Sequence, residues 1–373
     1  MKLLLALILF FAAFANSQAQ NKLGIWLWFI EGTGFTHSEL ADTLATIGVK
    51  RIYVKVADGS LNTTTWPEVA DTTLVQTYKN AGLEVWAWSY NYDNNYNAQA
   101  NALTLAAQTG YEGYVVDIET EFNNKTTELH SLFSEFESAK NSVIANGTAN
   151  SDFKLYCTTW GNPITHNMHI EIIDQYVDGH MPQTYVEKWG IFAYQNVVYT
   201  VNQGTLEYQS FGIQNPVHHL VSAELNVITA TKIDSFFMAS GSESALWRVP
   251  GAGTTLNIWN TLNSVNWNAD FSVSAKERNN KPQTISLSQN YPNPFNPSTS
   301  INYEIQITNY DSPRLSIYNV LGNKIKDFTL SKAKGSVVWD GKNFEGKQVS
   351  SGKYFYELKN GTERKVRQMT LIK

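Results

Sequence analysis

The most chemically suggestive pattern in the sequence is a pair of acids, Asp117 and Glu119, at the end of the largely apolar segment 113–119. Alternate side chains of a strand share a face, so both carboxylates would point the same way, with Glu119 outermost. Two carboxylates about 5 Å apart repel by roughly 3 kcal/mol at an effective dielectric constant of ~20, which is about two pKa units. One carboxyl group would then keep its proton near neutral pH, as a general acid for a glycosidic oxygen must. The alternative is a structural pair neutralised by Lys55.

Glu224, which follows the apolar segment 219–223, is a second candidate acid. Retaining glycosidases use two carboxyl groups about 5 Å apart, one as general acid and one as nucleophile. A barrel with its acid on the fourth strand and its nucleophile on the seventh would give Glu224 the second role. The same carboxylate could instead begin a helix, where it would complement the helix dipole. The sequence leaves both interpretations open.

Aromatic residues are frequent around the same predicted strand ends. Flat C–H faces of sugars stack on indole rings, and a glycan cleft combines such rings with a few polar groups. Strand alternation sends about half of these rings toward the surrounding helices as core. The set comprises Trp26, Trp28, Trp86, Trp88, Tyr90, Tyr92, Trp160, Tyr185, Trp189 and Trp247.

Patterns for metal binding or a cysteine nucleophile are weak. His218 and His219 are adjacent, so on a strand they face opposite ways and cannot chelate one ion together. His166 and His169 have helical spacing but no third ligand, which is typical of surface histidines. Cys157 lies in a predicted strand without a paired histidine. We therefore expect no metal and no cofactor.

The elements that must position these groups alternate along the chain between short apolar strands and helices. The helix start at 36–39 has the Thr-x-x-Glu spacing of a capping box, and apolar residues recur at helical intervals over 129–144. Eight strand candidates predict a (β/α)8 TIM-like barrel over residues 22–275, the usual size for this α/β fold. A doubly wound sheet is the alternative, but no Gly-rich phosphate loop follows the first strand. The candidate strands are 24–28, 51–56, 83–88, 113–119, 154–158, 177–183, 219–223 and 244–248.

The amino-terminal segment has the features of an export signal. Lys2 precedes an apolar run over 3–15, and small residues at Ser17 and Ala19 suit cleavage, which predicts a signal peptide over residues 1–19. The run is shorter than the ~20 residues of a membrane span, so we do not expect an integral membrane protein. A formal net charge of −5 excludes a general basic field, so nucleic acid is not expected as a partner.

The carboxy-terminal part has a different pattern. A charged stretch at 276–284 predicts a linker, and residues 285–373 begin with a Pro-rich lead-in. Short alternating strands separated by turn residues follow. They predict a small all-β, Ig-like antiparallel sandwich as a second domain.

Several strand segments of the barrel resemble known glycoside hydrolases. Residues 51–59, 80–86 and 116–119, together with Gln99, look like the successive strand signatures of family 25, the lysozyme-like muramidases. The Asp-Ile-Glu step at 117–119 also resembles the second half of the chitinase motif of family 18. Met-Pro-Gln-Thr-Tyr at 181–185 is similar to the sixth-strand motif of that family.

By resemblance, Glu119 would be the general acid, Asp117 its assisting carboxylate and Tyr185 a contact to the substrate or the reacting centre. The chain departs from both families, because Trp26 stands where family 25 carries an acid and Val115 where family 18 does.

The tail carries a longer ordered set of motifs. Tyr-Pro-Asn-Pro-Phe-Asn-Pro at 291–297, Ile-Tyr-Asn-Val-Leu-Gly at 317–322, Trp-Asp-Gly at 339–341 and Ser-Gly-Lys-Tyr-Phe-Tyr at 351–356 closely resemble the type A C-terminal sorting domain of the type IX secretion system. The resemblance implies passage across an outer membrane by that machinery, followed by release or surface attachment. A carbohydrate-binding module is the alternative for this domain.

These observations predict a secreted barrel that cleaves a glycosidic bond in a polysaccharide or peptidoglycan-type glycan. The alternative is a non-catalytic glycan-binding or structural cell-surface barrel, since a fold can keep its cleft after losing its chemistry. The expected catalytic set is Glu119, Asp117, Glu224 and Tyr185, and the expected substrate contacts are Lys55, Trp88, Tyr90, Trp160, Gln183 and Trp247.

Overall fold

The computed structural model describes residues 21–62, 66–251, 258–271, 286–305, 313–330, 332, 334–360 and 363–372. The predicted signal peptide at 1–19 and the predicted linker at 276–284 lie outside the described residues. Contacts divide the chain into two compact units, Met1–Lys276 and Glu277–Lys373.

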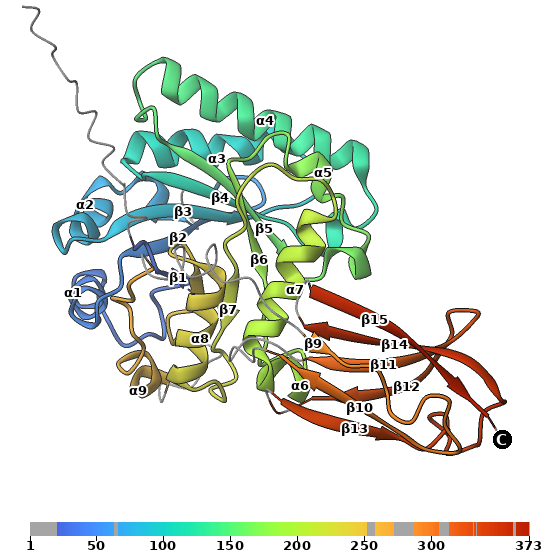
Figure 1. Cartoon of the computed structure of the whole chain (residues 1–373). Helices are drawn as coiled ribbons and strands as arrows, with labels where there is room; N and C mark the ends of the chain where they lie inside the picture. Colours follow the sequence, from blue (N-terminus) through green and yellow to red (C-terminus); the bar gives the residue numbers. More distant parts are fainter. Residues whose placement is uncertain are drawn as a thin grey trace, which may run out of the picture. The chain divides into compact units, whose positions relative to one another are not determined.

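The first unit is a closed barrel of eight parallel strands in sequential order, which confirms the predicted (β/α)8 fold (Figure 1). Strand β4 ends at Asp117, so Glu119 lies just beyond the strand instead of within it. The strands are β1 Gly24–Leu27, β2 Arg51–Asp58, β3 Glu84–Tyr90, β4 Gly113–Asp117, β5 Lys154–Trp160, β6 Gly179–Gln183, β7 Leu220–Ser222 and β8 Ala245–Trp247.

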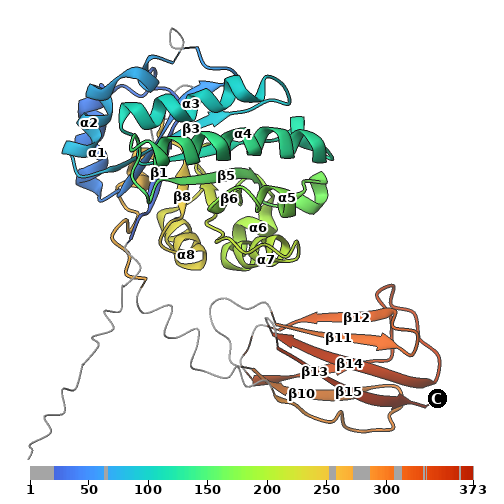
Figure 2. The ribbon, with the colours of Figure 1, turned by 90° about the horizontal axis from the view of Figure 1, so that it is seen from above.

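Helices cover the outside of the barrel (Figure 2). Thr36 caps the first helix, and the reciprocal bond from Glu39 completes the predicted capping box. The predicted apolar face of α4 is buried at Leu129, Leu132 and Phe136. The helices are α1 His37–Ile47, α2 Thr72–Asn80, α3 Tyr96–Thr109, α4 Thr126–Ala145, α5 Ile170–Ile173, α6 Ile191–Gln195, α7 Val197–Gln209, α8 Ala230–Ser240 and α9 Ile258–Leu262, with short 3-10 turns η1 Pro67–Ala70, η2 Thr120–Phe122 and η3 Pro163–His166.

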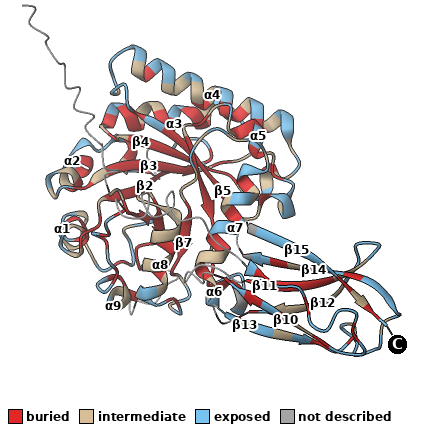
Figure 3. Ribbon diagram, in the orientation of Figure 1, coloured by how far each residue is buried: buried red, intermediate tan, exposed pale blue. Residues whose placement is uncertain are grey.

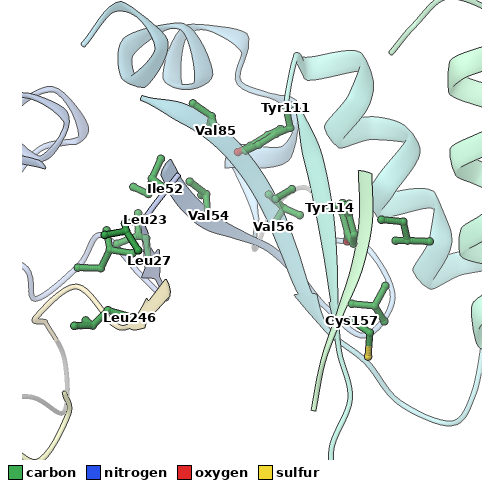
Figure 4. Close-up of a cluster of buried hydrophobic side chains, with 14 of the residues drawn as sticks. Leu23, Leu27, Ile52, Val54, Val56, Val85, Tyr111, Tyr114, Cys157 and Leu246 are labelled. Carbon is green, nitrogen blue, oxygen red and sulfur yellow. The ribbon is translucent and has the colours of Figure 1, made fainter. Parts of the chain in front are cut away.

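Two apolar layers hold the barrel together. The barrel strands that carry them are coloured mostly as buried in Figure 3. The outer layer lies between strands and helices and is mostly aliphatic, with Leu23, Ile52 and Val54 among its members (Figure 4). The inner layer fills the barrel itself and is mostly aromatic. Its buried members are Trp26, Tyr53, Trp86, Trp88, Val115, Tyr156, Met181, Leu220 and Ala245.

This inner layer corrects one expectation about the aromatic residues. Trp26, Trp86 and Trp88 are at most 2% exposed, so they pack inside the barrel and do not line its mouth. Rings of this size need small residues beside them. A Cβ added to Gly113 would lie 2.5 Å from the indole of Trp86, and glycine leaves that space free.

The amino-terminal end of the barrel is closed by a buried cation. The Arg51 guanidinium lies 4.2 Å from the centre of the Trp86 ring. It donates to Glu84 at 2.9 Å and to Glu243 at 3.3 Å, and its side chain has no exposed surface. This arrangement pairs the charge from two directions, as a buried guanidinium requires.

The second unit consists of a three-stranded sheet, β13-β10-β9, and a four-stranded sheet, β12-β11-β14-β15, with antiparallel pairing throughout. Residues from both sheets share one core, which includes Ile301, Leu315 and Tyr356. The predicted small all-β domain is therefore confirmed. The strands are β9 Ser286–Leu287, β10 Thr299–Glu304, β11 Arg314–Asn319, β12 Lys324–Thr329, β13 Lys334–Trp339, β14 Gly352–Asn360 and β15 Glu363–Leu371.

Candidate active site

The two acids singled out in the sequence are joined by one amide. The side-chain nitrogen of Gln183, at the end of β6, donates to Asp117 Oδ1 at 3.0 Å and to Glu119 Oε1 at 3.2 Å. Because one nitrogen reaches both oxygens, those oxygens are at most about 6 Å apart. Three residues predicted separately as catalytic or substrate-binding therefore meet at the carboxyl end of the barrel strands, where barrel enzymes place their sites.

Local packing turns both acids inward. Ile118, between them, is fully buried in the outer layer, and its backbone nitrogen donates to Thr158 on β5. Asn91 fixes the other side, because its backbone and side-chain nitrogens both donate to the carbonyl of Asp117, at 2.9 and 3.1 Å. The backbone that carries Asp117 and Glu119 is therefore hydrogen-bonded to β5 on one side and to Asn91, just after β3, on the other.

The environment favours keeping a proton on this pair. Burial and then the charge of Glu119 raise the pKa of Asp117 well above its ordinary value, against the opposing effect of Lys55. Burial also raises the pKa of Glu119, and Glu121 adds to the rise, while Gln183 opposes it. Asp117 is 5% exposed and Glu119 is half-buried. The deeper acid is thus the better proton holder and the outer acid the more accessible one.

Lys55 lies inside the site, not at its surface. Its ammonium is 2.7 Å from Asp58 Oδ2 and is 4.9 Å from the ring centre of Trp66 and 5.1 Å from that of Trp88. The residue is 5% exposed. An ammonium group enclosed in this way acts on the carboxyl pair through its electric field. Its burial argues against the expected direct contact between Lys55 and a ligand at the mouth.

Tyr90, an expected substrate contact, is half-buried at the end of β3. Its hydroxyl donates to Glu121 Oε2 at 2.8 Å. The sequence reasoning missed Glu121, although it stands two residues beyond Glu119 and continues the same alternation of acids.

Glu224 is held between two cations that the sequence reasoning also missed. Lys188 forms an ion pair with one oxygen, and Arg248 Nε donates to the other at 2.9 Å. Burial acts to raise the pKa of Glu224, but these two partners outweigh it and hold the pKa below its usual value. Helix α8 begins only at Ala230, so the interpretation of Glu224 as a helix start is wrong.

The remaining residues expected near the substrate differ in how deeply they are buried. Trp88 is 2% exposed and donates to the carbonyl of Leu27, so its ring cannot stack on a ligand without rearrangement. Tyr185 and Trp247 are half-buried and pack on the inner layer from above. Trp160, the last residue of β5, is half-buried, and its ring centre lies 3.9 Å from that of His166.

His219 and Cys157 lie outside the carboxyl pair and are buried in the protein. His219 is bonded at one nitrogen to Thr184 and at the other to Thr205, both at 2.8 Å, and burial lowers its pKa to about 3. Burial raises the pKa of Cys157, which keeps it a thiol. Within the described residues, His, Cys, Asp and Glu side chains form no group of three or more suited to a metal ion.

A cavity of about 350 Å³ lies at the opposite, amino-terminal end of the barrel, where Glu84, Trp86 and Glu243 line it. Its carboxylates Glu84 and Glu243 already pair with Arg51. Barrel chemistry occurs at the other end. The carboxyl pair, not this cavity, is therefore the candidate site.

The tail of the chain matches a known protein family. Residues 289–373 match the family described as "Secretion system C-terminal sorting domain". The second unit is a type IX sorting domain. The match indicates that the protein is exported to the cell surface or beyond it, and it implies that the type IX machinery recognises the tail. No helix among the described residues has the length and apolarity to cross a membrane.

No curated protein matches the chain. Among solved structures, dimeric latent PorU from Porphyromonas gingivalis is 15% identical, with a TM-score of 0.22, over 25% of this chain and 10% of that one. An O-GlcNAc hydrolase of Thermobaculum terrenum is 10% identical, with a TM-score of 0.41, over 68% of this chain and 62% of that one. A chitinase from Chromobacterium violaceum is 10% identical, with a TM-score of 0.37, over 88% of each chain. This chain thus spans about a tenth of the first protein and less than two thirds of the second.

Proposed function

We propose that the barrel is a secreted glycoside hydrolase in which Glu119 is the general acid and Asp117 holds the proton that Glu119 delivers. The observation that carries the proposal is the bond of Gln183 to both carboxyl groups at the mouth of the barrel. A pair this close cannot ionise fully without mutual repulsion. It therefore retains one proton at the pH where a glycosidic oxygen needs an acid.

The different depths of the two acids support these roles. Glu119 is the acid that a substrate in the mouth can reach, whereas Asp117 is nearly enclosed. The proton of the pair passes from Asp117 to Glu119, and Glu119 gives it to the glycosidic oxygen as the C–O bond breaks, so that the leaving sugar carries the proton away. The pair then carries more negative charge, which the Gln183 amide and the nearby Lys55 ammonium stabilise.

Glu224 supplies an anion on the β7 side of the mouth. Its two cationic partners keep it ionised, so it can stabilise positive charge that develops on the sugar ring. Water completes the reaction by adding OH to the anomeric carbon and replacing the proton that the acid gave up. Tyr185 packs against the inner layer, and the charges of Asp117 and Glu119 act on its hydroxyl group. A side chain this close to both acids suits a contact near the reacting centre.

The second candidate function is a non-catalytic glycan-binding barrel. Trp26 favours it, because this residue stands where the resembling family 25 enzymes carry an acid, and its indole is stacked on Tyr53 at 5.1 Å. In that case the carboxyl pair would serve only as a polar contact for a bound sugar.

Product analysis separates the two functions. The exported protein and its Glu119→Gln variant would be incubated with chitin, xylan, cellulose and peptidoglycan, and reducing ends would be measured. Glu119→Gln keeps the shape and loses the proton, so we expect at least a hundredfold loss of turnover with glycan binding retained. The matched control is Glu128→Gln in the first turn of α4, which should behave as wild type. Binding without hydrolysis by the wild-type protein would favour the second function, and near wild-type turnover of Glu119→Gln would reject the proposed acid.

A further inference from the structure

Two aromatic side chains of the barrel stand out by their exposure. Phe29 and Trp189 are each 37% exposed, and no other aromatic side chain of the barrel whose exposure the structure describes is as exposed. Phe29 follows β1 and Trp189 follows β6, so both lie in loops at the carboxyl ends of strands, the same end as the carboxyl pair. Large rings left open to water at the edge of a site are typical of binding surfaces.

Both rings are held in place from beneath. Phe29 is stacked on Trp66, with ring centres 5.3 Å apart and planes 18° apart, and is tilted against Trp28 at 5.0 Å. Trp189 lies so close to the chain after β5 that a Cβ added to Gly161 would come within 2.6 Å of its ring. Rings fixed in this way lose little conformational entropy when a flat ligand stacks on them.

Phe29, the carboxyl pair and Trp189 stand at three separate points around the mouth. In the closed ring of eight strands, three strand spacings separate β1 from β4, two separate β4 from β6, and three lead from β6 through β7 and β8 back to β1. A chain that crosses the mouth from the loop after β1 to the loop after β6 therefore passes near the barrel axis, toward which the acids of β4 are turned. With neighbouring strands about 4.8 Å apart, the two rings are on the order of 10 Å or more from each other. One sugar ring cannot stack on both.

We propose that the mouth binds an extended glycan chain, with one sugar on Phe29 and another on Trp189, so that the bond presented to Glu119 is internal to the chain. This inference rests on the proposed function and narrows its substrate to polymers of several sugars. A barrel that removed terminal sugars would instead need a closed pocket around one ring, whereas here two exposed rings stand at separate points around the mouth that the acids face.

Binding measurements test the inference separately from catalysis. Phe29→Ala and Trp189→Ala would be made in the Glu119→Gln background of the full chain. Calorimetry would then use oligosaccharides from chitin, xylan, cellulose and peptidoglycan, from disaccharide to hexasaccharide. We expect each change to weaken hexasaccharide binding by about fivefold to tenfold, with a smaller effect on the disaccharide. Phe344→Ala, which removes a 58% exposed phenylalanine from the second unit, is the matched control and should change nothing.

The products give a second, independent readout. Internal cleavage by the wild-type protein shortens a polymer before monosaccharide accumulates, and this is the expected course. Hydrolysis that releases terminal sugars only, or hexasaccharide binding unchanged in both variants, would overturn the extended-chain inference and leave the proposed hydrolase standing. Failure of every glycan to bind would overturn both. If Phe29→Ala and Trp189→Ala weaken binding of a protein partner but of no glycan, the rings serve protein contact and the inference is wrong.

Discussion

Replacing Asp117 with asparagine should shift the pH dependence of hydrolysis. The variant keeps an oxygen to accept from Gln183 but removes one of the two charges. In the wild-type protein the facing oxygens are at most about 6 Å apart, and at an effective dielectric constant of ~20 two charges at that distance repel by about 3 kcal/mol. This repulsion corresponds to roughly two pKa units for the last proton of the pair.

The assay is the pH profile of kcat/KM, whose alkaline limb reports loss of the essential proton. Without Asp117, Glu119 titrates beside a neutral neighbour, so the limb should move to lower pH by about two units. The rate at the new optimum should also fall, because the proton holder is gone. An alkaline limb that does not move would show that Lys55 already neutralises Asp117, and the interpretation of the acids as a structural ion pair would replace ours.

The same variant has a stability readout with a defined sign. Since the folded protein raises the pKa of Asp117, the folded state binds more protons than the unfolded chain above about pH 4, and stability falls as pH rises through the folded pKa. Asp117→Asn removes this loss. Its Tm should exceed that of the wild type at pH 7, and the difference should disappear near pH 4. A lower Tm at pH 7 would contradict the burial argument.

Three further predictions concern the scaffold. Arg51→Met should lower the free energy of unfolding by about 3 kcal/mol, because Glu84 and Glu243 lose their shared partner, whereas Arg364→Met at the surface should have little effect in denaturant titrations. Gly113→Ala should cost about 2 kcal/mol in the same titrations, since the added methyl group meets the Trp86 indole; unchanged stability would refute the close packing inside the barrel. Truncation after residue 276 should leave a folded, active barrel with its own core, but in the native cell it should remain in the periplasm; normal yield outside the cell would show that the tail is not the export signal.

The barrel could be predicted because its strands are short, apolar and regularly interrupted, so the pattern of each one is local. Strand alternation also gave the face of Asp117 correctly as the inner one. Strand alternation could not predict how deep each side chain lies along the barrel axis. Trp26 and Trp28 share a face, yet only Trp26 lies inside the aromatic core, because depth depends on how far each strand is staggered against its neighbours.

The side chains that contact the candidate acids were harder to predict from the sequence. Lys188 and Arg248 reach Glu224 from different loops, and nothing in the local sequence of any of the three indicates that they meet. Gln183 could be chosen because it ends a strand predicted to face the mouth, but its bond to both acids depends on the register between β4, β5 and β6. Contacts of this kind follow from tertiary structure, which a single strand pattern does not encode.

The most direct test of the central claim is a crystal structure of the Glu119→Gln variant with an uncleaved glycan. We predict a sugar chain across the barrel mouth, with a glycosidic oxygen within about 3 Å of the side chain at position 119 and with Gln183 still bonded to Asp117. A glycan bound elsewhere, or one whose glycosidic oxygens all lie beyond hydrogen-bonding distance of position 119, would contradict the assignment of Glu119 as the acid.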